Sequence, residues 1–150
     1  MIDAPAEAVS EQFREYTEEA WNRGSFDTVD RLFAPDVTVH NTQSGETYEG
    51  RDAFRGWIED VRTGFPDFEV DMDETVFIVG RDHVAIQWVV RGTHEGRLSA
   101  MDAEPTHESI ELHGTTVYEL DDGQVTEAWW HYDNVAFLTQ LGIAPEALTA

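Results

Sequence analysis

The sequence predicts an α+β domain, in which a curved antiparallel sheet packs against helices. Helical periodicity of apolar residues dominates up to residue 63, and long segments of alternating residues dominate from residue 68 to residue 133. No repeat and no linker rich in glycine, serine or proline divides the chain. We therefore expect a single domain over residues 1–150.

Three helices are predicted before the sheet. The first spans residues 6–22, where Phe13 and Tyr16 belong to the apolar stripe, and the second covers residues 26–33. The third spans residues 51–63. Glycine or proline follows each of them within a few residues, which is typical of helix ends.

The strands that form the sheet are expected at residues 68–79, 83–96, 108–120 and 124–133, after a short strand at residues 37–40. The turn sequences GRD and DDG separate the first two and the last two of the long strands, so both pairs are predicted to be antiparallel hairpins. Residues 97–107 contain small residues and a proline, and we expect a loop there.

The strand at residues 83–96 has two apolar faces. Val84, Ile86 and Trp88 alternate onto one face, and Ala85 and Val89 lie on the other. A solvated sheet face would be more polar, so we expect one face to cover a cavity and the other to contact a second copy of the chain. A homodimer is therefore predicted.

The charge balance limits the partners of this chain. Acidic residues number 31 against 9 basic ones, lysine is absent, and the formal net charge is −22. No broad basic surface is available for a phosphate backbone or an anionic membrane, so neither nucleic acid nor membrane is an expected partner. The acids are spread along amphipathic segments, which favours a halophilic protein whose surface charges are screened by salt.

Several enzyme classes and locations are also excluded by composition. The chain has no cysteine, which removes disulfides, thiolate nucleophiles and cysteine-ligated metals. No apolar run approaches the length of a membrane span, and the N-terminus lacks the pattern of a signal peptide. We expect a cytoplasmic protein.

The segment from residue 125 to residue 142 carries the strongest functional signal. In a strand, Trp129, His131 and Asp133 would share one face, and Trp130 and Tyr132 the other. Helical spacing then begins, so the aspartate lies where a strand becomes a helix. A carboxylate surrounded by aromatic residues is a candidate acid or base, and aspartate is equally favoured as a helix N-cap. Both interpretations remain open.

Metal and nucleophile motifs are weak or missing. The histidines are scattered, with His131 and Asp133 as the nearest pair, and no HExxH sequence occurs. A G-x-S-x-G elbow and a glycine-rich phosphate loop are absent as well. We predict no metal and no cofactor.

A family resemblance follows from three stretches: VHN at residues 39–41, WVVRGTHEG at residues 88–96, and DDGQVTEAWWHYDNVAFLTQLG at residues 121–142. Together with the order of elements, they resemble the SnoaL-like polyketide cyclase, or ester cyclase, branch of the NTF2-like superfamily. The resemblance implies an NTF2-like (cystatin-like) cone, with a strongly curved antiparallel sheet on three N-terminal helices and an internal pocket.

The resemblance also implies a chemistry. In these cyclases a single aspartate acts as acid and base in an intramolecular aldol closure, without metal or cofactor, and Asp133 matches its place. His131 is the nearest imidazole that would hydrogen-bond the carboxylate or the enolate oxygen. Substrate contacts are expected from His40, Trp57, Trp88, His94 and Trp129.

The predicted function is proton transfer on a small hydrophobic ligand that carries a carbonyl group. Burial among aromatic side chains favours the neutral form of a carboxyl group, which makes it a better base toward carbon acids. Two alternatives stay open. One is a non-catalytic small-molecule binding module, and the other is an isomerase, lyase or hydrolase on the same fold.

Overall fold

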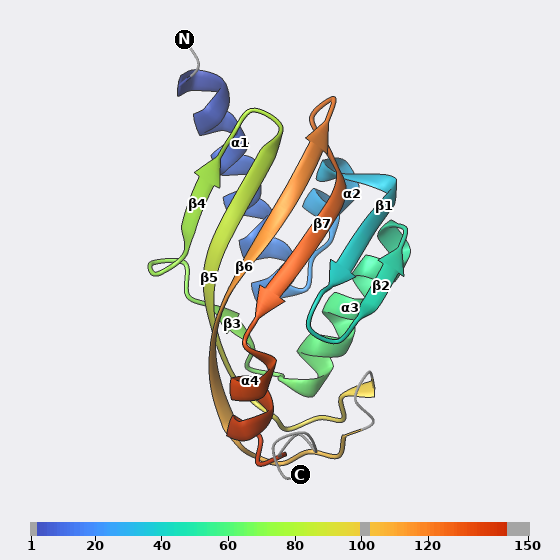
Figure 1. Cartoon of the computed structure of the whole chain (residues 1–150), viewed down its shortest axis with the longest axis vertical. Coiled ribbons are helices and arrows are strands. Elements are labelled where there is room, and N and C mark those ends of the chain that lie inside the picture. The colour runs from blue at the N-terminus through green and yellow to red at the C-terminus, as the bar shows by residue number, and fades with distance from the viewer. Residues whose placement is uncertain (1–2, 100–102, 144–150) are drawn as a thin grey trace.

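The computed structural model describes residues 3–99 and 103–143. Two helices and a π-helix precede the first strand, a third α-helix follows the second strand, and one short helix lies near the C-terminal end (Figure 1). They are α1 (Asp3–Tyr16), the π-helix η1 (Thr17–Asn22), α2 (Asp27–Leu32), α3 (Arg51–Gly64) and α4 (Asn134–Gln140). The three predicted helical regions are therefore present, and the first of them changes from α to π geometry at its last turn and a half.

The strands form one seven-stranded mixed sheet in the order β2-β1-β7-β6-β5-β3, with β4 also paired to β5. Among the described strands β1 and β7 pair in parallel, and the other pairs are antiparallel. The strands are β1 (Phe33–Asn41), β2 (Glu46–Glu49), β3 (Glu69–Val70), β4 (Val76–Val79), β5 (His83–Thr93), β6 (Ser109–Asp121) and β7 (Gln124–Tyr132).

The predicted α+β class is confirmed, and three details of the sheet differ from the prediction. Residues 68–79 form two strands, because a turn stabilised by Asp71 separates β3 from β4. In this turn Asp71 Oδ1 accepts from the Asp73 and Glu74 amides at 3.0 and 3.2 Å. Residues 46–49 form the strand β2, which the sequence did not predict, and β1 and β7 run parallel in a sheet predicted to be antiparallel.

The β6–β7 hairpin follows the sequence closely. The DDG turn places Asp122 at φ 53° and Gly123 at φ 79°, which is the pair of left-handed residues that a tight two-residue hairpin needs. Across the hairpin, Thr116 pairs with Trp130 and Gly114 with Tyr132. This register points Trp130 toward the helices.

The core lies between the helices and the inner face of the sheet. Phe13, Tyr16 and Phe54 are fully buried there, together with Phe33 at the start of β1. A hydrogen-bonded chain runs through this core, because Trp21 Nε1 donates to the Tyr16 hydroxyl at 2.9 Å and that hydroxyl lies 3.0 Å from the hydroxyl of Tyr118. The helices are thereby held at a fixed position over the sheet.

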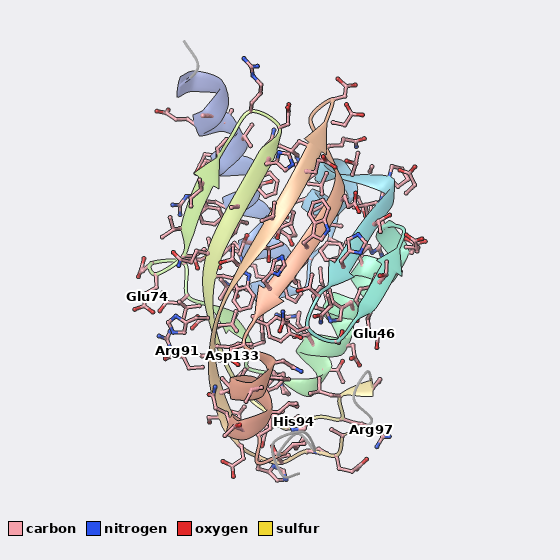
Figure 2. The ribbon with its side chains drawn as sticks, viewed as in Figure 1. Glu46, Glu74, Arg91, His94, Arg97 and Asp133 are labelled. Carbon is pink, nitrogen blue, oxygen red and sulfur yellow. The ribbon has the colours of Figure 1, made fainter. Side chains whose placement is uncertain are left out.

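The outer face of the sheet is polar at its β5 end. Arg91 pairs there with Asp71 at 2.7 Å, Glu111 at 2.9 Å and Glu74 at 3.0 Å (Figure 2). These carboxylates raise the pKa of the guanidinium, whose charge is permanent. Within the described ranges, no helix combines the length and the apolar character that crossing a membrane requires.

Candidate ligand-binding cavity

A cavity of about 290 Å³ lies between the inner face of the sheet and the helices. Alternation along the strands supplies its floor, since β5, β6 and β7 each contribute inward residues to it. These residues include Ile86, Trp88, Leu112, Trp130 and Tyr132. Trp21 from η1 and Trp57 from α3 close the opposite side, so most of the lining is aromatic or aliphatic.

The polar groups of the lining gather mainly where β1 and β2 meet α3. We call this region the polar end, defined by Asn41, Ser44, Glu46, Tyr48, Asp60 and Tyr132. A surface groove shares Glu46, Tyr48, Trp57 and Asp60 with the cavity, so the polar end is also its mouth. The rings of Tyr48 and Trp57 stack there, with centroids 5.1 Å apart and planes at 12°.

The charges at the polar end are negative. Glu46 and Asp60 are the carboxylates of the lining, and no arginine or histidine lines the cavity among the residues that the structure describes. Burial, followed by the nearby charge of Glu46, raises the pKa of Tyr48 well above its ordinary value, and Tyr132 and Asp60 act in the same direction. The Tyr48 phenol is therefore neutral at physiological pH.

A fixed hydrogen bond joins Tyr132 to Asn41 inside the lining. Asn41 is 5% exposed, and its Nδ2 donates to the Tyr132 hydroxyl at 3.0 Å. The Asn41 Oδ1 accepts from the backbone amides of Gln43 at 3.1 Å and Ser44 at 3.2 Å. Burial raises the pKa of Tyr132, so this phenol is neutral as well.

A mostly apolar cavity with a few polar groups at one end is typical of a small-molecule binding site. Residues 11–141 match the SnoaL-like polyketide cyclase family. The chain belongs to this family. No curated protein sequence matches it.

Solved structures show the same fold. A candidate SnoaL-like polyketide cyclase from Jannaschia sp. CCS1 is 22% identical with a TM-score of 0.80, over 93% of this chain and 95% of that one. IdmH, a candidate polyketide cyclase from Streptomyces antibioticus, is 28% identical with a TM-score of 0.70, over 90% and 99%. A protein from Catenulispora acidiphila DSM 44928 with a ketosteroid isomerase-like fold is 22% identical with a TM-score of 0.70, over 89% and 93%. The NTF2-like, or ketosteroid isomerase-like, fold predicted from the sequence is confirmed.

In this SnoaL-like chain Asp133 lies outside the cavity lining. It is exposed at the junction of β7 and α4 (Figure 2), and its Oδ1 accepts from the Ala136 amide at 2.9 Å as the N-cap of α4. The prediction that this carboxylate sits in an apolar pocket is therefore wrong. The physical reason is the register of β7, in which Ala128, Trp130 and Tyr132 face inward and the alternate residues face outward.

The same register places three further predicted site residues on the outer face of the sheet. The rings of His40 and Trp129 stack there with centroids 5.7 Å apart, and His40 Nε2 lies 2.6 Å from a carboxylate oxygen of Glu127. His131 is exposed, with its Nδ1 3.1 Å from the Thr42 hydroxyl. The expected pocket positions of His40, Trp129 and His131 are wrong for the reason that applies to Asp133.

The two remaining predicted tryptophans are where the sequence placed them. Trp57 and Trp88 both line the cavity, and Trp88 Nε1 donates to the Thr116 hydroxyl at 2.9 Å. His94 is fully buried at the end of the sheet near the loop of residues 97–107 (Figure 2) but is not part of the lining. Burial lowers its pKa, and its Nδ1 accepts from the Thr106 amide at 3.2 Å.

None of the six residues of the polar end was predicted from the sequence as a site residue. The strand alternation did place Tyr132 beside Trp130, opposite Asp133, and choosing that face would have identified it. Asn41 belongs to the VHN stretch, and Asp60 follows the exposed Glu59 on α3, so no motif marks either residue as part of a site. Within the described residues no cluster of three metal-ligating side chains occurs.

Proposed function

We propose that this SnoaL-like protein binds a hydrophobic, carbonyl-bearing small molecule in the cavity and catalyses proton transfer on it without a cofactor, as in an aldol cyclisation. The observation that carries the proposal is the cavity itself. Its lining is mostly apolar, and the hydrogen-bonding groups and carboxylates lie mainly at one end. Such a site holds an apolar skeleton while orienting one polar functional group.

We assign the acid/base role to Asp60 within this proposal. Of the two carboxylates in the lining, Asp60 is half-buried and Glu46 is exposed. A half-buried carboxylate on a long helix is held more rigidly than one at the start of a short edge strand, and Ser99 donates its amide to Asp60 at 3.2 Å. Asp133 would have to leave its position as helix cap to reach the cavity.

The test is hydrogen–deuterium exchange at the carbon next to the carbonyl of 2-acetylnaphthalene, followed by mass spectrometry in deuterated buffer. The wild-type protein should accelerate exchange over buffer, and Asp60→Asn should remove about 100-fold or more of that acceleration. Glu59→Gln is the matched control, because it removes one charge from the adjacent, exposed position of α3 and should leave the rate unchanged.

Two results would revise the proposal. Loss of exchange in Asp133→Asn, with Asp60→Asn unaffected, would return the acid/base role to Asp133. Binding of the ketone without any acceleration of exchange would favour the alternative predicted from the sequence, a non-catalytic small-molecule binding module.

The predicted homodimer stays a prediction, which the sedimentation coefficient of the purified protein tests.

A further inference from the structure

The hydrogen-bond directions at Asn41 follow from its partners. Two backbone amides, those of Gln43 and Ser44, meet one atom of the Asn41 side chain, and backbone amides only donate. That atom is therefore the carbonyl oxygen, and the other end of the side chain is the amino group. The amino group has no acceptor capacity, so it must donate to the Tyr132 hydroxyl, 3.0 Å away.

This arrangement determines which hydrogen bond the Tyr132 hydroxyl can still form. Its oxygen already accepts a proton from Asn41, and within residues 3–99 and 103–143 its own proton has no acceptor. Both side chains line the cavity, so this proton is available to a molecule inside it. Tyr132 is half-buried, and an oxygen atom on a ligand would accept this proton.

The residues around Tyr132 hold its ring in place and leave its hydroxyl proton available to a ligand. The rings of Trp88 and Phe137 flank it, each with a centroid 6.3 Å from its own, so the phenol is held between aromatic side chains. Neither lysine, arginine nor histidine is found among the described residues of the lining, so a ligand oxygen finds no cation to bind. The preferred acceptor at this position is a neutral carbonyl oxygen.

We propose that Tyr132 donates a hydrogen bond to the carbonyl oxygen of the bound small molecule, and that Asn41 is the positioning residue that aims this donor. The inference rests on the proposed function, because it supplies the contact for the carbonyl group of the same ligand. The hydrogen bond strengthens as negative charge develops on that oxygen during proton removal. Tyr132 would then stabilise the enolate formed when a carboxylate removes the adjacent proton.

The experiment compares two probes of similar shape, 2-acetylnaphthalene and 2-ethylnaphthalene, which differ in the carbonyl oxygen. Binding is followed by quenching of tryptophan fluorescence, and the carbonyl stretch of the bound ketone by isotope-edited infrared spectroscopy. Tyr132→Phe should weaken ketone binding about five- to tenfold, the value of one neutral hydrogen bond, and leave 2-ethylnaphthalene unaffected. The carbonyl band should also move to higher frequency.

Thr126→Val is the control, since it removes a hydroxyl group from the same strand outside the cavity lining, where Thr126 donates to the Glu119 carbonyl oxygen at 3.4 Å. It should leave the carbonyl band in place. Asn41→Val should keep the phenol but broaden the band, because the donor loses its fixed direction. A merely structural role of Asn41 would leave the width of the ligand carbonyl band unchanged.

The outcomes separate the two proposals. An unchanged affinity ratio and carbonyl frequency in Tyr132→Phe would overturn the role of Tyr132 while leaving the cavity as the binding site. If neither probe binds wild type, the proposed function fails and this inference fails with it. Should Tyr132→Phe not fold, a wild-type carbonyl band at the frequency found in an alkane solvent would by itself overturn the inference.

Discussion

Replacing Asp133 tests whether its carboxylate caps a helix or does chemistry. The structure gives this residue one polar contact of consequence, the bond from the Ala136 amide at 2.9 Å. Asp133→Ala leaves that amide without its side-chain partner, and loss of an N-cap costs about 1 kcal/mol, with a range of roughly 0.5–2 kcal/mol. Asn caps helices about as well as Asp, so Asp133→Asn should cost close to nothing.

The cost should appear in global stability, because α4 is too short to persist without its neighbours. A helix of 7 residues is unstable alone, and this one is joined to β6 by the Gln140 side chain, which bonds the backbone of Glu111 at 2.7 and 3.0 Å. In a protein of this size, 1 kcal/mol corresponds to about 2–4 °C in Tm. Urea unfolding and calorimetry measure both quantities.

The pair of variants also separates stability from activity. We expect Asp133→Ala to lower the free energy of unfolding, Asp133→Asn to preserve it, and both to retain ligand binding and exchange activity. Equal destabilisation by both variants would refute the cap as the source of the effect. A stable Asp133→Asn protein without activity would show that the carboxylate itself is needed.

Three further predictions concern packing, pH and salt. Gly114→Ala should destabilise the fold by about 1–3 kcal/mol and weaken ketone binding, because the new Cβ would overlap the Trp88 ring and lie 2.7 Å from the His131 carbonyl oxygen. Gly56→Ala is the control, at an open helical position, and urea unfolding should show that it is neutral or stabilising. Burial lowers the pKa of His94 in the folded protein, so below about pH 6.5 the unfolded chain binds a proton at this residue more readily than the folded chain. The contribution of His94 to stability is therefore full above that pH and declines as the pH falls toward the folded pKa. His94→Gln should reduce this dependence of the unfolding free energy on pH, measured by denaturation at several pH values. Raising KCl from about 0.1 M to about 1 M shortens the screening length from about 10 Å to about 3 Å. It should raise Tm, because salt then screens the repulsion among the surface charges of a protein with net charge −22, and a Tm that is independent of salt would contradict the halophilic interpretation.

Most of the fold was predictable because local patterns and tertiary structure agree. Periodicity located α1, α3 and the long strands, and the DDG turn fixed the β6–β7 hairpin. The short elements were less accessible. β2 has 4 residues and β3 has 2, and each exists because a longer neighbouring strand offers it hydrogen bonds. Such strands depend on partners that are distant in the sequence, so their own residues carry little signal.

The site was predictable only in part, for a reason particular to β7. Alternation divides its residues into two sets correctly, but both sets contain a tryptophan and a group capable of chemistry. The inward set is decided by the pairing with β1 and β6, which a single sequence does not show. Trp57 and Trp88 do line the cavity, because Trp57 lies on the apolar face of its helix and Trp88 shares its strand face with Ile86, which lines the cavity too.

The parallel pairing of β1 with β7 has a consequence for how the molecule assembles. Phe33 pairs with Val125, and His40 with Trp129. β1 is therefore synthesised early in translation but cannot complete its pairing until β7, near the end of the chain, has been synthesised. Until then β1 exposes an unsatisfied edge to which other chains can attach. We expect slow, late closure of the sheet and a nascent chain that depends on protection from aggregation until its last strand leaves the ribosome.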